Sequence, residues 1–282
     1  MKIAVINDLS GMGRCSLVAS ISVLSVLGQQ VFPVPTAILS NQTGYPQFSF
    51  VDFTDNMDEY LANWQSMGTK FDVIYSGFLS NCSQVKKIEK MRDSMGHENT
   101  LLVVDPVMGD GGQKYATFSD ELCNEVKTLA TMADVVTPNV TEACLLTGID
   151  YNEFIKGTNL SNFEQRFFDL ATKVSLLGPQ KVVITGWEND EKTKHVYNFV
   201  FDNGEFNYTK NDMFGGHYSG TGDIMASIIT GKIACGKSLF GATKTAADFV
   251  AIAVKDAFQC GVDKNDGVNF EKFLQLLVER QK

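Results

Sequence analysis

The chain has 282 residues, of which 44% are hydrophobic and 20% charged, as is typical of a globular protein with a large core. Its 33 acidic and 24 basic side chains give a formal net charge of -9, so general binding to nucleic acid is not expected, because it needs a surplus of Lys and Arg. No apolar run approaches the ~20 residues of a membrane span, and the N-terminus becomes polar too early for a secretory signal.

Short apolar runs alternate with longer amphipathic stretches in the first part of the chain. The apolar runs predict strands and the longer stretches predict helices. Pro33 and Pro35 place their strand at an edge of the sheet or outside its central ladder, because proline cannot donate a ladder hydrogen bond. In chain order we expect a strand at 3–6, a helix at 16–27, strands at 31–39 and 48–53, a helix at 55–67, a strand at 71–75, a helix at 82–95 and a strand at 101–104.

The same alternation continues to the end of the chain. Asp202-Asn203-Gly204 is a strong hairpin signal, because Asn and Gly tolerate the positive φ of a tight turn. We expect a helix at 119–132, a strand at 135–136, helices at 141–146 and 161–177, a strand at 182–184, a hairpin of 195–201 with 205–210, and helices at 223–234, 239–258 and 270–279.

Strand–helix alternation predicts an α/β fold, with a mainly parallel sheet and helices on both faces. The chain has no linker-like stretch and no internal repeat, so we expect one domain spanning 1–282. Residues 31–53 would form a small strand-rich annex at its edge. Ligands of open parallel sheets bind beyond the carboxyl ends of the strands, so the loops that follow strands are the candidates for chemistry.

A glycine-rich turn, Ser219-Gly220-Thr221-Gly222-Asp223, opens the predicted helix at 223–234. Glycines let the backbone come close to a ligand, and the first-turn N–H groups of a helix point outward with the positive end of its dipole. A phosphate is the natural ligand of such a turn. Asp223 would repel it unless the carboxylate serves as a base for an incoming hydroxyl group, although an ordinary helix start also favours Asp.

Two carboxylates belong to the segment that follows the predicted strand at 101–104. Asp105 stands at the strand end, and Asp110 lies in the Gly-rich loop beyond it. Mg²⁺ is commonly held by one or two carboxylates together with substrate phosphates. The segment therefore suits a magnesium site, and a plain surface turn is the alternative.

Two further loops follow strands. Asn139 with Glu142 three residues later is a capping-box pattern, which the start of a helix explains without a functional role. The same geometry would also aim both side chains at a metal–phosphate site. Asp8 and Ser10 follow the first strand, in a loop whose glycine spacing fits neither a dinucleotide-binding turn nor a P-loop. We expect Asp8 or Ser10 to hold a small polar ligand.

The cysteines and histidines indicate a reducing compartment and give no sign of a zinc site. The six cysteines are scattered with no C-x-x-C pair, which predicts buried thiols of a cytoplasmic protein. The three histidines, His97, His195 and His217, lie too far apart for zinc-ligand spacing. Of these only His217, just before the glycine turn, lies near a candidate loop.

Several motifs occur along the chain in a recognisable order. They are Ser40-Asn41-Gln42-Thr43-Gly44-Tyr45, Ser76-Gly77-Phe78, Asp105-Pro106-Val107-Met108-Gly109-Asp110, Thr137-Pro138-Asn139 with Glu142, and Gly220-Thr221-Gly222-Asp223. Each is weak alone, but their order over nearly the whole chain resembles the ribokinase superfamily and, within it, the pyridoxal (vitamin B6) kinases.

The resemblance implies a ribokinase-like three-layer α/β/α domain that phosphorylates the 5′-hydroxymethyl group of pyridoxal, pyridoxine or pyridoxamine with ATP. It also implies Mg²⁺ with ATP, leaves activation by K⁺ open, and implies a homodimer in which each subunit keeps its own active site. The implied roles are Asp223 as base with Gly220 and Gly222 as anion hole, Asp105, Asp110 and Glu142 at the metal, Asn139, Thr185 and Thr221 at ATP, and Asp8, Ser10, Thr43 and Phe78 at the substrate.

Two departures from the pyridoxal kinase pattern keep other functions open. Asp8 stands where many members have Ser, and the segment around it is similar to the G-S-D-P-S-G of hydroxymethylpyrimidine kinases of thiamine synthesis; Phe78 replaces a frequent Tyr. A hydroxymethylpyrimidine kinase, a sugar or nucleoside kinase, and a catalytically silent nucleotide-binding regulator are therefore alternatives. Asp223 with both glycines argues against silence, because a regulator does not need a base.

Overall fold

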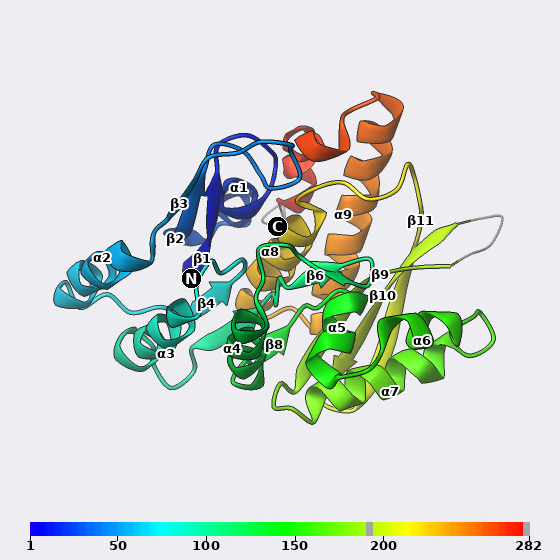
Figure 1. The fold of residues 1–282 in the computed structure, drawn as a ribbon, viewed down its shortest axis with the longest axis horizontal. Helices are drawn as coiled ribbons and strands as arrows, with labels where there is room; N and C mark the ends of the chain where they lie inside the picture. The colour runs from blue at the N-terminus through cyan, green and yellow to red at the C-terminus, as the bar shows by residue number, and fades with distance from the viewer. Residues whose placement is uncertain (190–193, 279–282) are drawn as a thin grey trace.

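The computed structural model describes residues 1–189 and 194–278 (Figure 1). Its centre is a nine-stranded sheet with the order β11-β10-β9-β8-β5-β4-β1-β2-β3. The strands of this sheet are β1 (Lys2–Ser10), β2 (Gln30–Leu39), β3 (Phe50–Asp52), β4 (Val73–Ser76), β5 (Leu101–Val104), β8 (Val135–Val136), β9 (Lys181–Glu188), β10 (His195–Asp202) and β11 (Glu205–Asp212), and a separate hairpin pairs β6 (Gly109–Asp110) with β7 (Gln113–Lys114).

Helices cover both faces of the sheet. They are α1 (Ser16–Val26), α2 (Thr54–Ser66), α3 (Ser83–Met95), α4 (Asp120–Thr131), α5 (Val140–Thr147), α6 (Tyr151–Lys156), α7 (Phe163–Ser175), α8 (Thr221–Ala234) and α9 (Leu239–Gln259), followed by the 3₁₀ segments η1 (Lys264–Asp266) and η2 (Phe270–Leu277). Successive side chains of β1 alternate between two cores. Ala4 and Ile6 pack with α2 to α7, and Ile3 and Val5 pack with α1, α8 and α9. The expected three-layer α/β/α fold is confirmed.

The direction of winding reverses between β1 and β4. Strands β2, β1, β4, β5, β8 and β9 are parallel, whereas β3, β10 and β11 are antiparallel to their neighbours. The helix after β1 packs on one face, and the helices after β4 and β5 pack on the other. Such a switch point opens a crevice beyond the carboxyl ends of the strands. Here those ends carry the loops that the sequence singled out.

The start of the chain differs from the sequence expectation. The first strand runs to Ser10 instead of ending at residue 6, so Asp8 and Ser10 lie within β1. The segment 31–53 does form strands at the edge of the sheet, but not a separate annex, because β2 pairs along its length with β1 and β3 is the outermost strand of the same sheet. Pro33 and Pro35 do lie on an open edge, since β3 covers only Ala37 to Leu39 of β2.

Other boundaries differ less. The hairpin of β10 and β11 is confirmed, with Asn203 at φ 50° and Gly204 at φ 96° in its turn. Helix α6 was not expected, and the predicted last helix is the 3₁₀ segment η2, with residue 279 outside the described residues. All six cysteines are free, but Cys235 and Cys260 are exposed, so the expectation of buried thiols is wrong for these two. In the described ranges no helix is long and apolar enough to cross a membrane.

Candidate active site

The glycine turn holds the first turn of α8 open to a ligand. Gly220 is the N-cap at φ 78°, and a Cβ there would lie 2.0 Å from the backbone oxygen of Arg14, so only glycine fits. A Cβ on Gly222 would meet no atom within 4 Å. The Thr221 hydroxyl donates to the backbone oxygen of Tyr218 at 3.0 Å and closes the turn. The first N–H groups of a helix have no acceptor within it, so this end of α8 can bind an anion.

Asp223 lies in that first turn, against the end of β1. Its Oδ1 accepts a hydrogen bond from Asn7 Nδ2 at 2.9 Å, and the backbone N–H of Ser16 donates to the same carboxylate. Burial raises the pKa of Asp223 to about 6, an effect that the charge of Asp8 reinforces and the two hydrogen bonds oppose. A carboxylate whose pKa lies near neutrality is a better base than an ordinary Asp.

The side chains of Asp8 and Ser10 meet beside Asp223. Ser10 Oγ donates to Asp8 Oδ2 at 2.7 Å, and the Ser16 side chain also hydrogen-bonds Asp8. Burial raises the pKa of Asp8, while these serine hydrogen bonds lower it. Ser16 has φ 52°, a left-handed conformation that is strained for a residue with a side chain. Strain of this kind is common at functional sites.

Asp105 and Glu142 add two more buried carboxylates. Thr137 Oγ1 donates to Asp105 Oδ1 at 3.0 Å. Burial, together with the charge of Asp223, raises the pKa of Asp105 to about 7. Burial also raises the pKa of Glu142, with an added contribution from Asp105. These three carboxylates therefore lie within electrostatic reach of one another, which favours a cation at the site.

Asn139 and Glu142 form the capping box that the sequence allowed. Asn139 Oδ1 accepts the Glu142 N–H at 2.9 Å, and Glu142 Oε2 accepts the Asn139 N–H at 2.8 Å. Both side chains also reach the Asp110 segment: Met108 N–H donates to Glu142 Oε1 at 3.1 Å, and Asn139 Nδ2 donates to the Gly109 oxygen at 2.8 Å. The structural reading is thus confirmed, and the box anchors the hairpin that carries Asp110.

The donor set suits magnesium carried by a phosphate ligand. Asp105 is buried and Asp110 exposed, and both offer the hard carboxylate oxygens that Mg²⁺ prefers. Across residues 1–189 and 194–278, no three His, Cys, Asp or Glu side chains gather to hold a metal alone. A site that needs substrate phosphates to complete its coordination is consistent with both facts. The metal roles of Asp105, Asp110 and Glu142 stay predictions.

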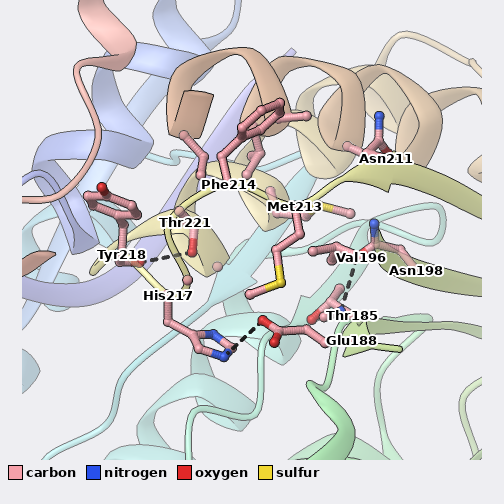
Figure 2. A pocket seen from close by; sticks show the side chains of 18 of the residues that line it. Thr185, Glu188, Val196, Asn198, Asn211, Met213, Phe214, His217, Tyr218 and Thr221 are labelled. Carbon is pink, nitrogen blue, oxygen red and sulfur yellow. Dashed lines mark hydrogen bonds and ion pairs between the residues drawn. The ribbon is translucent and has the colours of Figure 1, made fainter. Parts of the chain in front are cut away.

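A pocket lies beside the glycine turn, between β9–β11 and α9 (Figure 2). Met213 and Phe214 supply apolar wall, Thr221 and Gly222 of the turn line one part of the pocket, and Thr185 of β9 lines another. The Thr185 N–H donates to the Pro138 oxygen at 2.9 Å, which ties β9 to the end of β8. An apolar slot that ends at an anion-binding turn fits a nucleotide, with its base in the slot and its phosphates at the turn.

A histidine and a lysine lie at the edge of this pocket. His217 Nε2 is 3.1 Å from Glu188 Oε1, and this hydrogen bond raises the pKa of His217 (Figure 2). A Cβ on Gly216 would lie 3.2 Å from Lys264 Nζ, so that ammonium group stands over the glycine pair. His217 is paired with the Glu188 carboxylate, so the positive charge that favours an anionic ligand here is that of Lys264.

The expected substrate residues are brought together only in part. Phe78 is half-buried, and its ring contacts Phe118 edge-on at 5.7 Å between centroids. Asn7 joins Phe78 to Asp223, because Asn7 Oδ1 accepts the Phe78 N–H at 3.0 Å. Thr43 is exposed in a segment that lies against the loop after β1, where the Gln42 N–H donates to the Met12 oxygen at 3.0 Å.

Two residues beside Asp223, Asn7 and Ser16, were missed by the sequence analysis. The signal for Asn7 was a polar side chain directly after the buried run 3–6, where a strand that continues would place it inside the protein. Ser16 gave no comparable signal, because its contacts depend on the backbone conformation at the start of α1.

The family model for phosphomethylpyrimidine kinase matches residues 17–269. The chain belongs to the phosphomethylpyrimidine kinase family. One relative is pyridoxine kinase of Bacillus subtilis, which is 26% identical to this chain over an alignment that covers 83% of this chain and 82% of the relative. Hydroxymethylpyrimidine/phosphomethylpyrimidine kinase of the same organism is 27% identical and covers 67% of this chain and 66% of its own. Relatives of both kinds make the chain a kinase and leave its acceptor alcohol undecided.

Solved structures agree with this assignment. A protein from Bacteroides thetaiotaomicron, provisionally described as a phosphomethylpyrimidine kinase and solved with pyridoxal, is 35% identical with a TM-score of 0.92, over 100% of this chain and 96% of that one. Pyridoxal kinase from Lactobacillus plantarum is 27% identical with a TM-score of 0.85, over 98% and 96% of the two chains. The expected resemblance to pyridoxal kinases of the ribokinase superfamily is confirmed.

Proposed function

We propose that the protein phosphorylates the 5′-hydroxymethyl group of pyridoxal, pyridoxine or pyridoxamine with ATP. The observation that carries the proposal is Asp223, a carboxylate with a raised pKa of about 6 at the anion-binding end of α8. Asn7 links it to Phe78, whose half-buried ring suits a flat aromatic substrate. The pyridoxal in the relative that is 35% identical over the whole chain supports the same acceptor.

The chemistry follows from the positions of these groups. Asp223 accepts the proton of the substrate hydroxyl group while the oxygen of that hydroxyl forms a bond to the γ-phosphorus of ATP. The bond between the γ-phosphorus and the β,γ-bridging oxygen breaks, and ADP leaves with that oxygen. The N–H groups after Gly220 face the charge on the transferred group. The pocket beside Thr185 holds the nucleotide, and His217 and Lys264 face its anionic part. Mg²⁺, when bound, would neutralise phosphate charge near Asp105 and Asp110.

A substrate panel separates this proposal from the main alternative. With Mg-ATP we expect kcat/KM to be highest for one of the three B6 vitamers. Asp8 beside the base, and the relatives that are hydroxymethylpyrimidine kinases, favour hydroxymethylpyrimidine as the competing acceptor. A higher kcat/KM for hydroxymethylpyrimidine than for every vitamer would assign the chain to that reaction. If the protein phosphorylates neither kind of alcohol, the remaining alternatives are a sugar kinase, a nucleoside kinase and a catalytically silent regulator.

Asp110→Asn tests the proposed metal site. Asp110 is exposed, and its Oδ1 accepts only the neighbouring Gly111 N–H, at 2.8 Å, among the hydrogen bonds of the described chain. We therefore expect the Mg²⁺ concentration for half-maximal rate to rise several-fold with no change in melting temperature.

Glu142→Gln serves as the comparison, because it also places an amide NH₂ against the backbone donors of the capping box. It should raise the Mg²⁺ requirement, and the lost capping hydrogen bond, worth about 1 kcal/mol, should offset part of the stability gained by removing a buried carboxylate. An unchanged Mg²⁺ dependence in both variants would remove these two carboxylates from the metal site.

The same proposal includes a cytoplasmic location and a homodimer. The six free cysteines support a reducing compartment, where thiols stay unpaired. The dimer is carried by the resemblance to pyridoxal kinases and is measured directly by sedimentation of the purified chain. Activation by K⁺ is measured in the same assays by exchanging K⁺ for Na⁺.

A further inference from the structure

One fully buried polar residue stands beside the proposed base without a role in the reaction described above. Asn7 is 0% exposed and lies on β1, on the face that Ile3 and Val5 share with α1 and α8. Burying an amide costs free energy unless its hydrogen bonds are made. The hydrogen-bond partners of Asn7 therefore indicate its role.

The partners fix the orientation of the amide. Asn7 Oδ1 accepts two backbone N–H groups, that of Asp8 at 2.9 Å and that of Phe78 at 3.0 Å. Only the oxygen of the amide can accept, so the NH₂ group must face the other way. There Nδ2 donates to Asp223 Oδ1 at 2.9 Å. A flipped amide would set NH₂ against two donors, so the donor facing Asp223 is determined by the backbone.

Gly77 provides the room for this arrangement. A Cβ on Gly77 would lie 2.5 Å from Asn7 Nδ2 and 2.7 Å from Asn7 Cγ, closer than real contacts allow. The glycine of the Ser76-Gly77-Phe78 motif is therefore explained by the Asn7 side chain that packs over it. The amide thus connects three elements: the end of β1, the segment after β4 that carries Phe78, and the start of α8.

We propose that Asn7 is a positioning residue, which holds the Asp223 carboxylate in the orientation that receives the substrate proton and couples it to the Phe78 wall of the site. The inference rests on the proposed function for its kinetic readout and on geometry alone for its structural readout. Asn7 does not reach the substrate, because its side chain is fully buried between the end of β1, the segment after β4 and the start of α8.

The surroundings of Asp223 make this donor important. The charged and titratable groups that act on it or feel its charge are Asp8 on β1, Asp105 after β5, Tyr75 on β4, Tyr115 after β7 and Cys15 before α1. None of these five is cationic. Beside the Ser16 N–H, the Asn7 amide is the other group that lowers the pKa of Asp223 by hydrogen bonding. Its loss should leave the carboxylate free to rotate and harder to ionise.

Asn7→Leu is the variant that tests the proposal, because leucine has the same branched arrangement of heavy atoms and makes no side-chain hydrogen bonds. We expect kcat to fall by about 10–100-fold, as for a small displacement of a catalytic group, with a smaller change in KM for ATP. In an Asp223→Asn background the same substitution should cost almost no further kcat, because residues that act as a unit are not additive. The acidic limb of the kcat profile should move to higher pH.

Gln84→Leu is the matched control. Gln84 is also a fully buried amide, with hydrogen bonds to Thr36, Thr54 and Ser80 on the opposite face of the sheet. It should lower the melting temperature as much as Asn7→Leu does while leaving kcat within about twofold and the pH profile in place. Equal kcat losses in the two variants, or a full further loss in the Asp223→Asn background, would overturn the proposal.

A second readout does not need turnover. Titration of the Asp223 carboxyl group by infrared or carbon NMR, assigned by its absence in Asp223→Asn, should give a higher pKa in Asn7→Leu than in the wild type. An unshifted carboxyl pKa contradicts the Asn7 proposal even in an active enzyme. Absence of turnover with every tested alcohol contradicts the proposed function, while the titration still decides the role of Asn7.

Discussion

Asp223→Asn is expected to lower kcat by about 10²–10⁴-fold, the usual contribution of a positioned base. Asparagine keeps the size of the side chain, and its oxygen can still accept from Asn7 Nδ2, so the first turn of α8 should keep its shape. ATP affinity should hold or improve, because a negative charge near the phosphates is removed. The measurement is kcat with the best acceptor together with the dissociation constant for Mg-ATP.

The same variant should be more stable than the wild type at pH 8. Burial raises the pKa of Asp223 from 3.8 to about 6, so the folded protein binds a proton more tightly than the unfolded chain does. This contribution to stability is fully present below the unfolded pKa and is lost as pH rises through about 6. Above that pH the wild type carries a buried charge that asparagine lacks, at a cost of about 3 kcal/mol.

A thermal melt at two pH values checks this sign. The gain of Asp223→Asn over the wild type should be present at pH 8 and vanish near pH 4, where Asp223 is protonated. An Asp that only caps the helix predicts near-normal kcat and a loss of about 1 kcal/mol at both pH values. That pair of results would refute the role of Asp223 as base.

The layers of the fold could be predicted from the sequence because strand and helix periods are local. The apolar run 3–6 and the longer helix-forming stretch after it define β1 and α1 wherever they pack. The edge position of the strand-rich segment 31–53 could be predicted, but its membership of the main sheet could not, because Pro33 and Pro35 report only on local pairing. At both prolines β2 pairs only with β1, because β3 does not extend that far along β2. A proline is tolerated there even though the strand belongs to the main sheet.

The candidate site could be predicted as a set of loops but not as a set of contacts. Gly220, Asp223 and Asp105 follow helix-start and strand-end patterns that sequence displays directly. The link between Asn7 and Asp223 spans 216 positions, and it depends on β1 continuing as a strand through polar residues. The hydrophobic pattern of β1 ends where its polar site residues begin. The pattern therefore could not predict that Asn7 positions Asp223.

The glycines of the anion turn should respond to alanine with opposite effects on stability. Gly220→Ala forces a side chain into φ 78° and sets its Cβ 2.0 Å from the Arg14 oxygen, so we expect a loss of about 1–3 kcal/mol. The turn must move to relieve the clash, and the N–H groups that face the phosphoryl oxygens move with it. Removing one such donor typically costs about 10²–10³ in kcat.

Gly222→Ala should lower activity while stability rises. A Cβ on Gly222 meets no atom of the protein, and alanine is the better helix former by about 1 kcal/mol, so the melting temperature should increase. The added methyl group occupies the space through which a phosphate would reach the first turn of α8, so KM for ATP should rise and kcat fall. Thermal melts and initial rates of both variants measure the pair. Full activity of a stabilised Gly222→Ala would mean that no phosphate approaches this turn, because a bound phosphate and the methyl group need the same space.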